Sequence, residues 1–123
     1  MATRDDIEHH LIQMGQAFET IEDGMWVLRD PPNIVITYRP PLVIFRSKLM
    51  EIPHKNREEF YKCLLTLNAS EMVHGAYALE DSNVVIVDTL EAENLNFNEF
   101  EASVEAIVLA VSQDYQTLKP FFD

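Results

Sequence analysis

Two stretches of the sequence, residues 24–36 and 75–86, follow the same pattern. Each opens with glycine, has an aromatic residue two positions later and a leucine two positions after that, and reaches aspartate and asparagine before an aliphatic run. The corresponding residues are Gly24 and Gly75, Trp26 and Tyr77, Leu28 and Leu79, and Asp30 and Asp81. Apolar segments interrupted by such turn residues are typical of β-hairpins. This repeat specifies an architecture and points to no reaction.

Apolar residues recur at helical spacing in three segments, residues 3–23, 57–67 and 97–118. The first helix is predicted from the stripe Ile7, Leu11, Met14, Phe18 and Ile21, with Thr3 and Asp6 as its capping box and Gly24 as its stop. Capping boxes at Asn56 with Glu59 and at Asn96 with Glu99 start the other two.

Strands are expected at residues 25–29, 34–39, 42–49, 76–80 and 84–90. In the third strand Arg46 and Lys48 alternate with Phe45, Ser47 and Leu49, which indicates one covered and one wet face. The order α-β-β-β-α-β-β-α predicts a single α+β domain over residues 1–123. Its antiparallel sheet should have about five strands, with the helices packed on it.

Composition limits the classes of function. The chain has 123 residues, a net charge of −12 and one cysteine, so it forms no internal disulfide and suits a reducing cytoplasm. Its longest apolar run, residues 106–111, is too short to span a membrane, and its acidic start is unlike a signal peptide. Residues 29–62 carry +3 and residues 71–123 carry −10. Such acidity repels nucleic acid and leaves two uses open, a well-solvated surface or attraction of a basic partner.

The residues that could support catalysis do not form a recognisable set. The three glycines stand alone, which excludes a phosphate-binding loop. His9 and His10 each follow an aspartate by one helical turn, but exposed pairing explains them better than a metal or acid–base role. Cys63 lies at helical spacing among apolar residues and is interpreted as a buried small hydrophobe. His54 and His74 are single loop residues. We therefore expect no catalytic, cofactor-binding or metal-binding residue, and no enzyme.

Trp26 and Tyr77 occupy the same position in the two copies of the repeat. They could stack on a ligand, but an aromatic residue at one strand position in both copies favours packing in the core.

Two of the predicted helices carry more apolar surface than one sheet can cover. Tyr61 and Leu65 widen the apolar arc of residues 57–67 to about 200°. On residues 97–118, Ala102, Ala106 and Leu109 form a second strip opposite the main stripe. A second copy of the chain is the simplest cover, so we predict a homodimer in which Tyr61 and Leu65 are the main contacts and the alanine–leucine strip the lesser one.

The order of elements, with residues 64–68 leading to residues 75–79, resembles the type III secretion chaperone-like fold. Within that group it is similar to the YbjN-like branch of bacterial sensory transduction regulators. The resemblance covers nearly the whole chain and implies a compact α+β protomer, usually a homodimer, that offers apolar patches to an extended segment of another protein. It implies no catalytic residue. The resulting hypothesis is a chaperone-like protein-binding module; the alternative is a small regulatory or adaptor domain that reads a folded partner or a small ligand.

Overall fold

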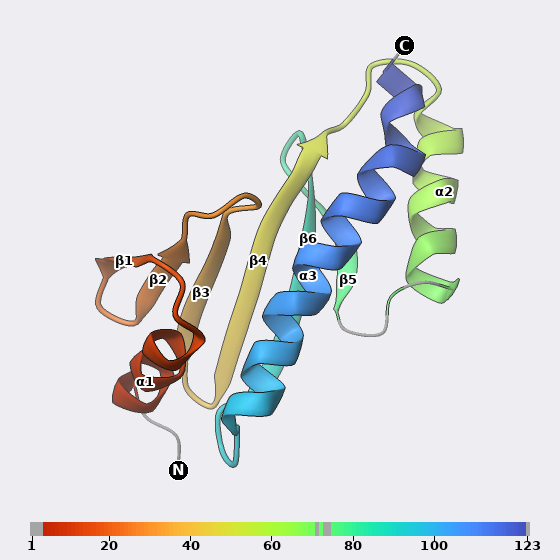
Figure 1. Ribbon diagram of the computed structural model, residues 1–123. Coiled ribbons are helices and arrows are strands. Elements are labelled where there is room, and N and C mark those ends of the chain that lie inside the picture. Colours follow the sequence, from red (N-terminus) through yellow and green to blue (C-terminus); the bar gives the residue numbers. More distant parts are fainter. Residues whose placement is uncertain (1–3, 71, 73–74, 123) are drawn as a thin grey trace.

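The protein is described by a computed structural model that covers residues 4–70, 72 and 75–122. Its centre is a six-stranded antiparallel sheet with the order β1-β2-β3-β4-β6-β5 (Figure 1). The predicted α+β class is confirmed, with one strand more than expected. The elements are α1 (Arg4–Met14), β1 (Phe18–Glu22), β2 (Met25–Leu28), β3 (Ile34–Arg39), β4 (Leu42–Glu51), α2 (Arg57–Ser70), β5 (Ala76–Glu80), β6 (Asn83–Glu91), α3 (Phe97–Leu118) and the short 3-10 helix η1 (Lys119–Phe122). Thr3, predicted to cap the first helix, and His74 lie outside the described residues.

The prediction of one helix over residues 3–23 is wrong. Helix α1 ends at Met14, because Gly15 adopts a left-handed conformation with φ of 77°. The chain then forms β1, in which Phe18 pairs with Leu28 of β2. Gly24 lies in the turn between these strands, with φ of 79°, and does not stop a helix. Pairing with β2 supplies main-chain hydrogen bonds that helical spacing alone does not reveal.

The other elements agree closely with the sequence prediction. Helix α3 has the expected bounds, and the Oδ1 atom of its N-cap Asn96 accepts a hydrogen bond from the Glu99 N–H at 2.9 Å. Helix α2 runs three residues further than predicted. Along β4 the exposed Arg46 and Lys48 alternate with buried Phe45, Ser47 and Leu49, as expected.

The three α-helices lie on the same side of the sheet (Figure 1). Helix α1 lies near β2 and β3, α3 runs along β4 and β6, and α2 stands beside β5, at the end of the sheet. Phe45 of β4 and Phe100 of α3 pack edge to face, with ring centroids 5.3 Å apart. None of the described helices combines the length and the apolar composition needed to cross a membrane.

The two aromatic residues of the repeat are core residues, as predicted. Trp26 and Tyr77 are both buried. Each also satisfies its polar atom on a helix: the Trp26 Nε1–H donates to Glu8 Oε1 of α1 at 3.1 Å, and the Tyr77 hydroxyl donates to Asp114 of α3. The equivalent residues of the two hairpins therefore attach the sheet to two different helices.

Candidate functional site

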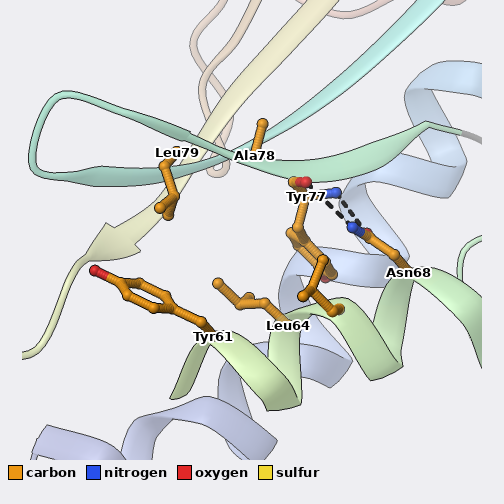
Figure 2. Close-up of a pocket in the computed structure, with 7 residues that line it drawn as sticks. Tyr61, Leu64, Asn68, Tyr77, Ala78 and Leu79 are labelled. Atoms are coloured by element: carbon orange, nitrogen blue, oxygen red, sulfur yellow. Dashed lines mark hydrogen bonds between the residues drawn. The ribbon is translucent and has the colours of Figure 1, made fainter. Parts of the chain in front are cut away.

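An apolar hollow of about 230 Å³ lies between α2 and β5, at the end of the sheet (Figure 2). Leu65 of α2 is 69% exposed and Leu79 of β5 is 50% exposed, so two of the leucines that line this hollow face solvent. Side chains of this kind favour contact with another molecule. The residues that line the hollow are Tyr61, Leu64, Leu65, Asn68, Tyr77, Ala78 and Leu79.

Strand β5 forms one edge of the sheet, and its outer side is only partly closed. The Asn68 side chain of α2 takes the place of a neighbouring strand at one residue: the Tyr77 N–H donates to Asn68 Oδ1 at 2.7 Å, and Asn68 Nδ2 donates to the Tyr77 carbonyl at 3.2 Å (Figure 2). Main-chain groups alternate between the two sides of a strand, so those of Leu79 point to the same outer side. No group within the described ranges bonds to them there.

The predicted interface residues divide between two places. Tyr61 is half-buried and Leu65 exposed, and both line the α2–β5 hollow. On α3, Leu109 is 56% exposed while Ala102 and Ala106 are half-buried, and none of the three lines this hollow.

Sequence reasoning missed Asn68 and Leu79 as parts of this site. The repeat gives Leu79 as a strand residue, but only the sheet order shows that β5 is an edge strand.

The remaining candidate residues are packed or exposed singly. Cys63 is half-buried, and burial together with the nearby charge of Asp114 raises the pKa of its thiol, which disfavours the nucleophilic thiolate. His10 is half-buried, with its ring centroid 5.4 Å from that of Phe100 and its Nε2 atom 3.4 Å from the Leu95 carbonyl. His9 and His54 are exposed. In the described part of the chain, no three His, Cys, Asp or Glu side chains are grouped to hold a metal ion.

The family model CesT_Tir_1 matches residues 1–122. The chain is similar to a chain of the heterodimeric ExoU-SpcU complex from the type III secretion system of Pseudomonas aeruginosa, at 17% identity and a TM-score of 0.73, over 94% of this chain and 96% of that one. It is similar to YbjN from E. coli at 16% identity and a TM-score of 0.65, over 91% and 93% of the two chains.

A third similar structure is that of the Yersinia pestis type III secretion chaperone SycH in complex with a fragment of YscM2, at 13% identity and a TM-score of 0.67, over 90% and 98% of the two chains. No curated protein sequence matches the chain. These matches confirm the predicted type III secretion chaperone-like, YbjN-related fold. At such identities the solved structures show a common fold and leave partners to be argued from this chain's own surface.

Proposed function

The chain belongs to the CesT_Tir_1 family, and on this premise we propose that it is a non-enzymatic, chaperone-like protein-binding module whose homodimer holds an extended segment of a partner protein. The observation that carries the proposal is the apolar hollow between α2 and β5, beside the open edge of β5. Its lining consists of apolar and aromatic side chains and one amide, so it offers contact area and hydrogen bonds but no carboxylate, imidazole, amine or thiol.

The α2–β5 surface is the part of the chain that we assign to the homodimer. In a two-fold dimer the same patch meets itself, so Leu65 of one protomer would enter the hollow of its partner. The same approach would bring the partner protomer to the main-chain groups of Leu79, to which nothing in the described part of the chain bonds. Because Leu65 and Leu79 are already partly covered in the protomer, their burial would stabilise the dimer by about 1–2 kcal/mol for each side chain.

Leu65→Asp tests this assignment by size-exclusion chromatography with light scattering. We expect the mass to fall from two chains to one, because an aspartate buried without a partner is costly. Leu109→Asp is the matched control, since Leu109 is similarly exposed but lies on the α3 strip. If only Leu109→Asp becomes monomeric, the interface is on α3; if Leu65→Asp remains dimeric, the assignment to α2 is wrong.

The client role draws support from similar structures that hold a second protein. Besides the two complexes above, the chain is similar to a chain of the ExsC-ExsE complex, with a TM-score of 0.74, and to a chain of the HopA1-SchA chaperone-effector complex, with a TM-score of 0.63. For this chain, we propose that the client is bound in an extended form, in the cytoplasm, where a lone cysteine stays reduced.

The alternative proposal is a regulatory or adaptor domain that reads a folded partner or a small ligand. It is favoured by the similarity to YbjN, a candidate transcription regulator from E. coli. Limited proteolysis of a purified complex separates the two proposals. A client that is cut throughout its length except where it contacts this protein supports the chaperone-like role, and a partner that resists cleavage as a whole domain supports the adaptor role.

A further inference from the structure

Strand β4 extends well beyond its neighbour β3. The pairing of the two strands ends at Arg46, whereas β4 continues to Glu51 and pairs with β6 over this length. The hydroxyl of Ser47 donates to the Asn33 carbonyl at 2.7 Å, which marks where the β2–β3 loop leaves the strand. In Figure 1 the final part of β4 has β6 on one side and no strand on the other. Residues 48–51 thus form an open edge inside the sheet, which we call the β4 edge.

The main-chain groups at the β4 edge can be assigned from the hydrogen-bond pattern. Tyr38 donates its N–H to the Gly24 carbonyl at 2.8 Å, toward β2, so the odd-numbered residues of β3 bond toward β4. Their partners are even-numbered residues of β4 up to Arg46, and Lys48 continues this series. A bulge between residues 48 and 50 shifts the alternation by one, which brings Glu51 to the same side. Lys48 and Glu51 therefore direct their N–H and carbonyl groups to the open side, and nothing in the described part of the chain bonds to them there.

A second hollow, of about 380 Å³, lies beside the β4 edge and differs in character from the α2–β5 hollow. Tyr115 is 38% exposed and Phe122 46% exposed, so aromatic surface faces outward here. Lys48 and Lys119 are exposed, and within the described ranges neither has an ion-pair partner. The hollow thus has two cations, Lys48 and Lys119, and one carboxylate, Glu51, and this local excess of positive charge is unusual in a chain of net charge −12. The lining residues are Lys48, Leu49, Met50, Glu51, Tyr115, Lys119 and Phe122.

Protection against aggregation explains part of this arrangement. Lysine side chains and bulges are common devices that prevent unwanted pairing at open strand edges, and Lys48 and the adjacent bulge fit that role. It does not explain why a second cation, Lys119, and two exposed aromatic side chains from α3 and η1 line the same hollow. Edge protection needs none of these three.

We propose that the β4 edge binds an extended segment of the partner protein as an added strand, and that this segment alternates acidic and apolar side chains. The inference rests on the proposed function, because it specifies the client and its binding place. Side chains alternate between the two faces of a strand, so the apolar ones would lie against Tyr115 and Phe122 on the helix side. The acidic ones would lie toward Lys48 on the helix-free face. Lys119 lies on the helix side with Tyr115 and Phe122, and its charge would attract the acidic segment as a whole without pairing with one side chain.

A fluorescein-labelled (Glu-Val)5 peptide and a matched (Lys-Val)5 peptide serve as probes, measured by fluorescence anisotropy at low salt. We expect (Glu-Val)5 to bind and (Lys-Val)5 not to bind. Lys48→Glu and Lys119→Glu should each weaken (Glu-Val)5 by about ten-fold, because each replaces attraction with repulsion. Lys62→Glu on α2 makes the same change of charge at an exposed position that does not line the hollow beside the β4 edge. It should have little effect on (Glu-Val)5 binding.

Backbone pairing is tested separately from charge. Methylation of alternate peptide nitrogens should abolish binding in one phase of the alternation and leave it intact in the other, as an added strand requires. Hydrogen exchange should show that the Lys48 and Glu51 amides become protected when (Glu-Val)5 binds.

Three results would overturn the inference: no binding of (Glu-Val)5, equal weakening by Lys62→Glu, or protection that appears at Leu79 and not at the β4 edge. None of them decides the dimer, which the Leu65→Asp experiment tests independently.

Discussion

At the scale of single residues, the glycine that opens the second hairpin is held by its surroundings. Gly75 has a φ of 79°, and a Cβ built on it would lie 2.5 Å from the Val87 carbonyl oxygen of β6 and 3.1 Å from Asp88 Cβ. Gly15, at the end of α1, has nearly the same φ of 77° but open space where a Cβ would stand. The two positions therefore separate the cost of the conformation from the cost of the contact.

Gly75→Ala and Gly15→Ala should both lower the melting temperature, by different amounts. The left-handed conformation costs alanine about 1 kcal/mol at either position. At Gly75 the clash with main-chain oxygen should raise the total to roughly 3 kcal/mol, since a main-chain atom of a paired strand cannot move aside easily. Thermal melts followed by circular dichroism measure both variants. If both variants lose the same amount of stability, β6 moves away from the new Cβ at position 75 at little cost.

The buried pair of Tyr77 and Asp114 predicts an alkaline limit of stability. Burial, the hydrogen bond to Asp114 and the charge of Asp114 all raise the pKa of Tyr77 above its ordinary value of about 10. Above about pH 10 the unfolded chain loses this proton while the folded chain keeps it. The folded state then binds more protons, so the free energy of unfolding falls as pH rises.

Tyr77→Phe should reveal this contribution in melts between pH 8 and 11.5. At pH 8 the variant should be less stable by about 1–3 kcal/mol, because the buried Asp114 carboxylate loses its donor. Above pH 10 its stability should decline less steeply than that of the parent protein. Cys63, whose pKa is also raised, is present in both chains and cancels in the comparison. If the stability of both proteins declines equally steeply above pH 10, the decline does not come from Tyr77.

At the scale of elements, the last turn of α2 connects the helix to the edge of the sheet. Asn68 lies in that turn and forms two hydrogen bonds with the main chain of Tyr77. Asn68→Ala should cost about 1–3 kcal/mol for the two bonds and should speed hydrogen exchange at the Tyr77 amide. Ser70→Ala is the control, because among the described residues the Ser70 hydroxyl bonds within the helix, to the Thr66 carbonyl at 2.9 Å. If the Tyr77 amide exchanges equally in both variants, Asn68 does not hold β5.

Local signals explain which elements could be predicted from the sequence. Helix α3 was placed correctly because its cap and its apolar period lie within one segment, and both hairpins carry their own turn residues. The end of the first helix was misplaced because Phe18 and Ile21 fit a helical period as well as a strand. Pairing of β1 with β2 decided between them.

The residues that α2 contributes to the candidate site could be predicted from the sequence, and those that the sheet contributes could not. Tyr61 and Leu65 follow from the breadth of the apolar arc on residues 57–67, which needs no knowledge of the fold. Leu79, by contrast, belongs to the site because β5 is the last strand, and the open edge of β4 exists because β3 is shorter. Strand order and relative strand length depend on the whole sheet, so no local pattern reveals them.

At the scale of the whole molecule, the two surfaces should respond to salt in opposite directions. Joining two chains of net charge −12 brings like charges together across the apolar α2–β5 surface, and salt screens this repulsion. Binding of an acidic segment at the β4 edge depends on attraction to Lys48 and Lys119, which salt also screens.

Between 50 and 500 mM NaCl we therefore expect the dissociation constant of the dimer to fall by roughly three- to ten-fold and that of (Glu-Val)5 to rise by a similar factor. Analytical ultracentrifugation measures the first and anisotropy the second, in the same buffers. Opposite signs alone do not distinguish two surfaces from one, because a peptide that competed with the dimer contact would also bind more weakly as salt strengthened the dimer. With two separate surfaces, saturating (Glu-Val)5 should leave the sedimenting mass at two chains. If saturating (Glu-Val)5 reduces the mass to one chain, the separation of the α2–β5 surface from the β4 edge is wrong.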